Sequence, residues 1–418
     1  MKLHNSAIIK ISSILKKKSE FLHAFLKKCY FKISYFLFAN KDFRYEIKNG
    51  FKFDLDLNPK DIDHFIGYYH HTPWSYDDKL LAINSIVNNK VVNVNIIDLE
   101  SSKTIFSDST TLWNFQQGPM LGWFPSSNVI YYNKIIKGVH KTIVYDLDMK
   151  TMSSYLFPIQ TLHPSSKSYL SINYSNLYKI NRDYGYKYPC SEMSNHDIGI
   201  WKCYFNDIKP ELLISMDSMK RINPSFNQSI GNEFNHCLFS MNGDTFLFIY
   251  RYTLDSTKYS KLILADFNSN SNNLRVINDS FISHMCWVDI DNVFYFGDSP
   301  NLGKGYYIYN ISTKEVKKVM QDNLNDGHPS INMEKKWIVI DSYPDSEYNC
   351  HLYLYNIETK QDIDIGIFKS NIKLHGYNRC DLHPRWNNSG DKVIIDSSHK
   401  GKRYPLLIDL GGIVNEQK

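Results

Sequence analysis

The chain has 418 residues, a formal net charge of +5, 22% charged residues and 15% aromatic residues, including 30 tyrosines. This length fits two or three average domains, or one propeller or barrel, and the composition is typical of many short strands. The first 36 residues hold eight lysines and one acid, Glu20, which leaves the rest close to neutral. That distribution argues against a nucleic-acid-binding protein, which is expected to carry a basic stripe with interleaved aromatic residues along its folded part.

Residues 6–40 place apolar residues at mixed three- and four-residue spacing, with lysines between them. This pattern predicts one or two amphipathic helices. Lysines interrupt every apolar run, whereas a secretory signal needs about 7 to 15 uninterrupted apolar residues and a spanning helix needs about 20. Three alternatives stay open for this segment: helices docked on the domain, helices that contact a membrane surface, or an atypical signal.

The cysteines do not show paired spacing, and their number, seven, is odd. We therefore expect no disulfide framework. A reducing compartment fits best, and we expect the protein to be cytoplasmic. The seven are Cys29, Cys190, Cys203, Cys237, Cys286, Cys350 and Cys380.

One pattern recurs along the chain: a polar residue or histidine, an aromatic residue or proline, a short turn, and then a β-branched or aromatic run. Its seven copies span residues 70–87, 120–133, 162–174, 235–251, 283–297, 327–344 and 382–398. Each copy predicts two strands joined by a tight turn, because Asn-Gly and Ser-Gly-Asp supply the positive φ that hairpins need. Further strand pairs follow most copies, as in residues 305–320 and 351–368.

Four strands per unit, at a period of roughly 40 to 55 residues, are the signature of a β-propeller blade. A sandwich would show strands at regular spacing without this self-similarity. The expected fold is therefore all-β, a seven-bladed β-propeller over residues 46–412, with a basic helical extension over residues 1–45 and a tail over residues 413–418. The third interval is longer, and its aromatic insertion, residues 171–205, could project over one face,.

Four copies begin with a histidine: His236, His284, His328 and His383. The first strand of each propeller blade lines the central channel, so these side chains are expected to converge near the axis. Several imidazoles, with Cys380 close to one of them, can form a metal site without a local ligand motif. The alternatives are that each histidine hydrogen-bonds a neighbouring blade and that Cys380 is a small buried apolar residue.

Polar and aromatic residues just before the second copy suit a sugar ligand. Trp113, Asn114, Gln116 and Gln117 provide an indole face and amides, which match sugar rings and hydroxyls,. The alternative is a polar loop between blades, capped by a core tryptophan.

Other candidates for chemistry are tyrosines and arginines. Tyr184 and Tyr186 could donate protons or stack on a ligand, although most tyrosines in this chain are packing residues. Arg251 and Arg385 are the arginines best placed to bind an anion. Residues 399–403 are predicted to form a solvent-exposed turn. A Gly-x-Ser-x-Gly elbow, a phosphate loop and a dinucleotide fingerprint are missing from the sequence,.

Residues 64–410 resemble the oligogalacturonate lyase-like propellers, a family with TolB-like repeats whose relatives include ulvan lyases. The specific motifs are "NHCLFSMNGDTFLFIYR", "DGHPSINMEKKWIVIDSYPD" and "CDLHPRW" followed by "IDSSHKGKR"; "GYYHHTPW", "WNFQQGPMLGWFP" and "SINYSNLYKINRDYGY" match more loosely. The resemblance implies β-elimination on a uronate-containing polysaccharide or oligosaccharide, with one divalent metal, Zn or Mn, per chain.

The same resemblance implies roles for individual residues. His236 would be the base or a metal ligand, His284, Cys380 and His383 would be ligands, and His328 would be a further inner-channel histidine, which we group with the metal ligands. Tyr184 or Tyr186 would complete the acid and base pair.

The chain departs from the family at positions that would bind an acidic sugar. Relatives usually have an Asp-Lys pair where this chain has His70 and His71, and arginines where it has Asn176, Lys179 and Asn181. Lys179 is the one cation left at those three positions, so it stays a substrate-binding candidate.

The first function to expect is a polysaccharide lyase-like protein that acts on an acidic polysaccharide or oligosaccharide. The alternative is a non-catalytic propeller that binds glycan or protein, for example in surface-polysaccharide assembly. Nucleic acid is not an expected partner, and the N-terminal helices provide the only expected contact with a membrane surface.

Overall fold

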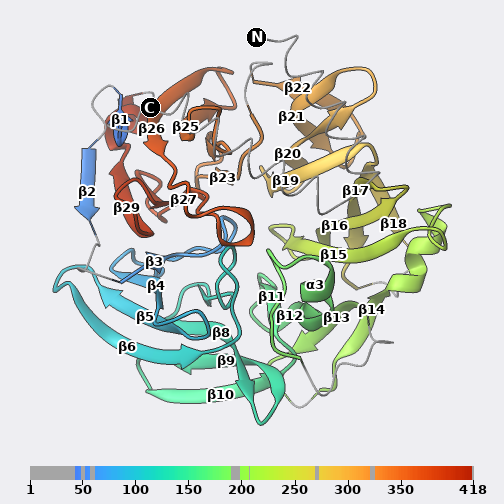
Figure 1. Cartoon of the computed structure of the whole chain (residues 1–418), viewed down its shortest axis with the longest axis horizontal. Helices are drawn as coiled ribbons and strands as arrows, with labels where there is room; N and C mark the ends of the chain where they lie inside the picture. Colours follow the sequence, from blue (N-terminus) through green and yellow to red (C-terminus); the bar gives the residue numbers. More distant parts are fainter. Residues whose placement is uncertain are drawn as a thin grey trace.

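A computed structural model describes residues 43–48, 52–56, 62–189, 198–206, 208–268, 273–320 and 325–416. These residues form seven antiparallel sheets around a central axis (Figure 1), which confirms the prediction of an all-β, seven-bladed propeller. The helices expected before residue 43 lie outside the described residues. Within the described residues, no helix is both long and apolar enough to cross a membrane.

The blades follow one another in chain order, and strands adjacent in sequence pair within each blade. The first blade contains β3 (His64–Phe65), β4 (Leu80–Ile86), β5 (Val92–Asp98) and β6 (Lys103–Thr110). The second contains β7 (Gly122–Trp123), β8 (Val129–Ile136), β9 (Val139–Asp146) and β10 (Thr151–Leu156). The third contains β11 (Ile159–Leu162), β12 (Ser168–Ile172), β13 (Gly199–Tyr204) and β14 (Glu211–Ser215). The fourth blade contains β15 (Ile230–Phe239), β16 (Thr245–Leu254), β17 (Thr257–Asp266) and β18 (Leu274–Asn278). The fifth contains β19 (Phe281–Trp287), β20 (Asn292–Ser299), β21 (Gly303–Asn310) and β22 (Val316–Val319). The sixth blade contains β23 (Pro329–Ile331), β24 (Trp337–Asp341), β25 (Asn349–Asn356) and β26 (Asp362–Lys369). The seventh contains β27 (Arg385–Trp386), β28 (Lys392–Ser397) and β29 (Tyr404–Asp409).

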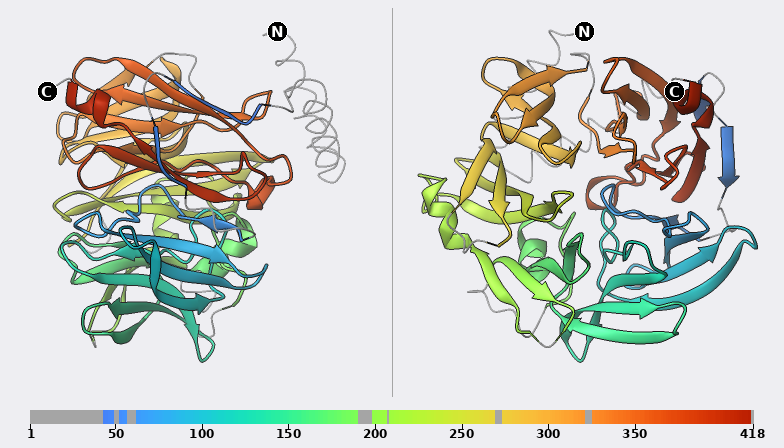
Figure 2. Two further views of the ribbon diagram at one scale, coloured as in Figure 1. Left: turned by 90° about the vertical axis from the view of Figure 1, so that its left-hand side faces the viewer. Right: turned by 180° about the vertical axis from the view of Figure 1, so that it is seen from behind.

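Strands from the start of the chain complete the last two blades. β2 (Lys52–Asp56) pairs with β29 as the fourth strand of the seventh blade, and β1 (Tyr45–Ile47) adds a fifth strand beside β26. Figure 2 shows these two strands beside the C-terminal blades. Hydrogen bonds between the two ends of the propeller therefore close its ring.

The turns of the repeat explain where its hairpins form. In the fourth blade, Gly243 has a φ of 78° between β15 and β16, and a Cβ at this position would lie 2.2 Å from His163 Nε2. Glycine is needed there because of both the backbone conformation and the close approach. His163 stacks on Phe267 and lies 3.1 Å from the carbonyl oxygen of Gly243, so the third blade packs on the fourth through this imidazole.

The insertion in the third blade begins with helix α3 (Tyr174–Ile180), which Figure 1 shows beside β11 and β12. Asn173 caps this helix by accepting a hydrogen bond from the backbone N–H of Asn176,. Gly185 then packs directly on the helix, because a Cβ there would lie 2.1 Å from the backbone nitrogen of Tyr178. The other helical elements among the described residues are η1 (Met216–Arg221), η2 (Gly376–Asn378) and α4 (Gly411–Glu416).

Candidate functional site

A loop from the first blade occupies the centre of the propeller. β3 pairs with β4 at His64 and Phe65, and pairing resumes only at Trp74, so residues 66–73 leave the sheet. Arg385 holds this loop from the seventh blade by donating to the carbonyl oxygens of Tyr68 (2.9 Å) and Gly67. We call residues 66–73 the central loop.

Two β-bulges turn histidines toward the axis. In β15 the register shifts between Asn235 and Leu238, and His236 has a φ of 55°. In β19 the register shifts between Ile282 and Met285, next to His284. An extra residue in a strand re-aims a side chain, and bulges are frequent next to active sites.

The structure brings together the four histidines expected at the axis. The ring centroids of His284 and His328 are 4.0 Å apart, and those of His328 and His383 are 4.3 Å apart. His236 lies 6.1 Å from His284, stacks on Tyr68 of the central loop with a centroid distance of 5.0 Å, and has Nε2 3.2 Å from the hydroxyl of Tyr68. We call these four residues the axial histidines.

Three residues of this region have the geometry to hold a metal ion. Candidate ligand atoms of His328, Asp381 and His383 all lie within 4.8 Å of one another. Nε2 of His328 and Nε2 of His383 are buried and have no hydrogen-bond partner, as a ligand atom requires. Nδ1 of His328 lies 2.9 Å from Asp341, so a carboxylate orients this imidazole from behind, an arrangement typical of metal-binding histidines,.

Cys380 is not in this group, and its neighbour Asp381 is. Burial raises the pKa of the Cys380 thiol to about 12, and its sulfur is not among the atoms that lie within 4.8 Å of one another. The backbone from Asp381 to His383 is not a regular strand, since His383 has a φ of 44°, and the ligand atoms of these two residues nevertheless meet. The fourth expected ligand, His284, lies next to His328 and has Nδ1 3.0 Å from Asp326.

Burial determines the charge of three of the axial histidines, His236, His284 and His383. It lowers the pKa of His236 and of His383 well below the ordinary value, and the positive charge of Arg251 adds to this effect at His236. Burial lowers the pKa of His284 to about 4. These imidazoles are therefore neutral at pH 7, the form that can bind a metal or accept a proton.

Asp341 stays ionised although burial raises its pKa. The contact with His328 and hydrogen bonds from the backbone N–H groups of His328 and His383 outweigh the burial, so its net pKa is lowered. Asp381 is paired with Arg379 at 2.7 Å, and Asp326 lies 3.0 Å from Nδ1 of His284.

Tyr184 and Arg379 form one rim of the site. The Tyr184 ring lies edge-on to His236, with a centroid distance of 4.8 Å, and its hydroxyl lies 3.4 Å from Nη2 of Arg379. Arg379 also binds Asp381, with Nε 2.7 Å from the carboxylate, and Asp183. Burial raises the pKa of Tyr184, so the phenol keeps its proton at neutral pH.

Arg251 forms another part of the rim. Its Nη1 lies 3.9 Å from Glu233, and its Nη2 donates to the carbonyl oxygen of Ser283 at 3.4 Å. Glu233 is buried, which raises its pKa, and its carboxylate also accepts a hydrogen bond from Asn181 at 3.1 Å. The side-chain amide of Asn181 is therefore engaged in a hydrogen bond within the protein.

The other residues expected to bind substrate occupy different positions. Asn114 donates to the carbonyl oxygen of Tyr184 at 3.0 Å, and Gln116 donates to that of Arg379 at 2.9 Å, so these amides hold the backbone of the rim. Gln117 is buried without a partner for its amide atoms, and Trp113 packs on Phe65 in the first blade.

The last three candidates either lie away from the axial histidines or have a structural role. Tyr186 stacks on Tyr174 with a centroid distance of 4.2 Å, and Asn133 donates to its hydroxyl, so it belongs to the core. Lys179 is exposed on α3. Arg385 anchors the central loop, as described above.

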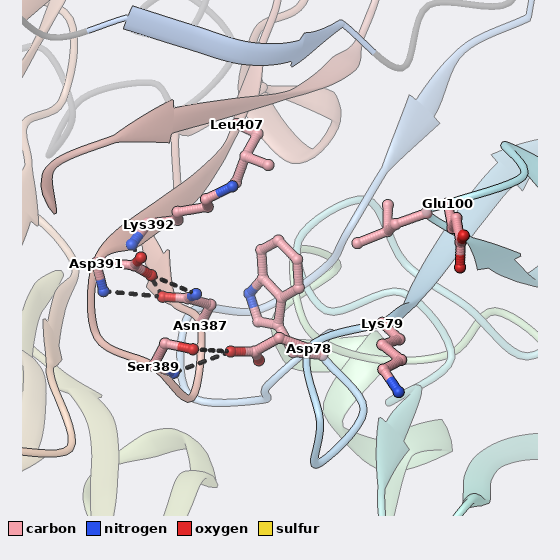
Figure 3. Close-up of a pocket in the computed structure, with 10 residues that line it drawn as sticks. Asp78, Lys79, Glu100, Asn387, Ser389, Asp391, Lys392 and Leu407 are labelled. Carbon is pink, nitrogen blue, oxygen red and sulfur yellow. Dashed lines mark hydrogen bonds between the residues drawn. The ribbon is translucent and has the colours of Figure 1, made fainter.

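A cavity of about 520 Å³ lies between the first and seventh blades (Figure 3). Asp78 spans the seam beside it by accepting hydrogen bonds from Asn388 and from the backbone N–H and hydroxyl of Ser389. The polar groups drawn there mostly bind one another, which fits a role in closing the ring.

Comparison with solved structures places this fold beside an enzyme. An oligogalacturonate lyase in complex with manganese aligns with a TM-score of 0.64 and 13% identity, over 90% of this chain and 98% of that one. Oligogalacturonate lyase from Vibrio parahaemolyticus aligns with a TM-score of 0.60 and 14% identity, over 87% and 97%. The chain has the fold of oligogalacturonate lyase.

A chain of a different enzyme has a similar fold. Kuenenia stuttgartiensis hydrazine synthase aligns with a TM-score of 0.50 and 10% identity, over 83% of this chain and 96% of that one. No protein-family model and no curated protein matches the sequence. Since one fold hosts several functions, the function has to be argued from the site.

Proposed function

We propose that the protein is a lyase that cleaves a uronate-containing oligosaccharide or polysaccharide by β-elimination at the axial histidines. One observation carries the proposal: His328, Asp381 and His383 present ligand atoms within 4.8 Å of one another, and the ring of His284 lies 4.0 Å from His328 and 6.1 Å from His236. The fold shared with an oligogalacturonate lyase in complex with manganese supports it.

His328, Asp381 and His383 would hold the metal, with His284 beside them. Two imidazoles and a carboxylate suit manganese or zinc. A bound divalent metal would neutralise the substrate carboxylate and so acidify the adjacent C5 proton.

The residues of the chain then move two protons. Nδ1 of His236 has no hydrogen-bond partner, whereas Nε2 faces the hydroxyl of Tyr68, so Nδ1 is the atom that accepts the C5 proton. The electron pair of the C5–H bond forms the C4–C5 double bond, and the bond from C4 to the glycosidic oxygen breaks. Tyr184, which lies beside His236, donates its proton to that oxygen,.

Ultraviolet absorbance of the 4,5-unsaturated uronate product tests this proposal on pectic, ulvan-type and capsular uronate polymers. His236→Asn is the best variant, because asparagine tolerates the positive φ at this position,. We expect it to lower the rate by about 10²- to 10⁴-fold, and chelator to abolish the signal. His375→Asn, at an exposed histidine, is the matched control and should keep full activity.

A second candidate function, a glycan-binding propeller without catalysis, is favoured by the burial of the site. His236, His284, His328 and His383 are only 1%, 1%, 0% and 2% exposed. A catalytic metal keeps an open position, whereas a structural metal is enclosed. A folded, metal-loaded protein that binds oligogalacturonate in calorimetry but gives no product would establish this second function.

A further inference from the structure

One ion pair joins two sides of the propeller next to the axial histidines. Asp183 lies in the insertion of the third blade, and Arg379 lies in the loop that leads into β27 of the seventh blade. These blades are not neighbours, because the fourth to sixth blades separate them on one side of the ring and the first and second on the other. The pair therefore spans the channel, and we call it the cross-channel pair.

The exposed fractions of the side chains place the cross-channel pair between solvent and the proposed metal ligands. The side chain of Asp183 is 31% exposed and that of Arg379 is 19% exposed, whereas that of Asp381, which Arg379 also binds, is 3% exposed. The guanidinium of Arg379 lies 5.7 Å from the ring centroid of Tyr343, and that ring lies 5.6 Å from the ring of the buried His328. The pair therefore covers the proposed ligands on this side.

The two members of the pair are held with different firmness. The backbone carbonyl oxygen of Arg379 accepts hydrogen bonds from Gln116 at 2.9 Å and from Arg403 at 3.1 Å. Its Nε also binds the buried carboxylate of Asp381 at 2.7 Å. Among the described residues, the carboxylate of Asp183 has no hydrogen-bond partner other than Arg379. Asp183 can therefore turn toward solvent while Arg379 stays in place.

The group that Nη1 of Arg379 binds is a carboxylate, which is also the acidic group of a uronate sugar. A sugar carboxylate on the same nitrogen would form the same charge-assisted hydrogen bond. An ion pair that is partly exposed contributes little to stability, so little is lost when Asp183 leaves. Nη2 of Arg379 also lies 3.4 Å from the hydroxyl of Tyr184, the proposed proton donor. A carboxylate on Arg379 would thus lie close to the bond that breaks.

We propose that Asp183 occupies the place of a substrate carboxylate on Arg379 and that an acidic sugar enters the site by displacing it. The inference rests on the proposed function, which provides the acidic sugar. The carboxylate concerned belongs to a sugar beside the one that loses its C5 proton, because the proposed metal neutralises the carboxylate of the latter. Displacement of Asp183 would also open a path to ligands that are buried in the free protein.

Calorimetric titration of the full-length, metal-free protein with trigalacturonate tests the inference, because it measures binding without any elimination. Asp183→Asn keeps the size of the side chain and removes the competing charge, so it should bind trigalacturonate about two- to fivefold more tightly than the native protein. Damage to the fold would weaken binding, so it cannot produce this gain. Asp217→Asn is the matched control, since Asp217 pairs with Lys220 at 3.0 Å on η1 and should bind as the native protein does.

The methyl ester of trigalacturonate separates the carboxylate from the sugar ring. It has the same rings without the charges, so the native protein and the Asp183 variant should bind it equally. Three results would overturn the inference: equal affinity of the two proteins for trigalacturonate, the same gain for the ester, or no saturable binding of trigalacturonate by either folded protein.

The rate at which chelator removes Mn²⁺ is a second readout, and it involves no sugar. Because the cross-channel pair covers the proposed ligands, Mn²⁺ should leave Asp183→Asn about two- to fivefold faster than the native protein, and Asp217→Asn should match the native rate. Equal rates in Asp183→Asn and the native protein would show that the pair does not cover the site and would overturn the inference. A native protein that binds no Mn²⁺ would instead contradict the proposed function, and the titration with trigalacturonate would still decide the role of Asp183.

Discussion

The carboxylate of Asp341 lies 2.9 Å from Nδ1 of His328 and accepts a hydrogen bond from the backbone N–H of the same residue at 2.6 Å. It also accepts the backbone N–H of His383 at 2.9 Å. One buried carboxylate therefore positions two of the three proposed metal ligands, although it does not itself belong to that group.

Asp341→Asn should weaken metal binding, because it removes the charge that fixes the His328 imidazole. We expect a loss of about 10- to 100-fold in Mn²⁺ affinity, the usual effect of losing a partner behind a ligand. Calorimetric titration of metal-free protein measures it. Asp345→Asn is the matched control, since Asp345 holds His351 at 3.0 Å on a different part of the sixth blade and should leave the affinity unchanged. Equal affinity of the Asp341 variant and the native protein would contradict the proposed ligand set.

Tyr68→Phe should slow the proposed elimination without unfolding the protein. The hydroxyl lies 3.2 Å from Nε2 of His236, while the ring stacks on the same imidazole, and only the first contact is lost. We expect kcat to fall about tenfold or more, because the imidazole loses the partner that fixes its tautomer. Metal content should stay the same, and a fall in both kcat and metal content would instead indicate a structural role.

Acid should destabilise the protein through its buried neutral histidines. His140 is an example outside the proposed site: burial lowers its pKa to about 4, although the contact of Nε2 with the carbonyl oxygen of Tyr188 (2.9 Å) opposes this shift. An unfolded histidine has a pKa of about 6.5, so between these values the unfolded chain binds more protons than the folded one. Stability is therefore full above about pH 6.5 and is lost as the pH falls toward about 4.

Urea unfolding between about pH 7 and about pH 4 measures this loss. His140→Gln keeps a donor for Tyr188 and cannot be protonated, so it should reduce the slope by up to about 1.4 kcal/mol per pH unit. His375→Gln, at an exposed histidine, should leave the slope as it is. An unchanged slope in the His140 variant would show that other groups cause the acid transition.

The sequence predicts the blades and the convergence of the axial histidines for the same reason. Both follow from the repeat, whose turn residues and apolar runs set the hairpins and place equivalent positions on the axis. Asp381 could not have been found from its spacing to His383, because residues 379–384 form no strand and His383 has a φ of 44°.

The remaining parts of the site depend on tertiary contacts. Tyr68 reaches His236 only because the central loop leaves its sheet, and Asp341 is placed by the register of β24. The sequence does not distinguish Tyr184 from Tyr186. In the structure Gly185, which lies between them, packs on Tyr178, Tyr184 contacts His236 and Tyr186 stacks on Tyr174. Such contacts leave no periodic signal in the sequence.

The seam between the first and seventh blades should be sensitive to Asp78. Its carboxylate accepts hydrogen bonds from the backbone and side chain of both Asn388 and Ser389, between 2.7 and 2.9 Å. Asp78 also has a φ of 58°, which is more costly for alanine than for asparagine,. Asp78→Ala should therefore lower the free energy of unfolding by about 2 to 4 kcal/mol, and Asp78→Asn by clearly less. Chemical denaturation of both variants measures the difference. If Asp78→Ala is as stable as the native protein, ring closure depends on the pairing of β2 with β29 and not on this seam.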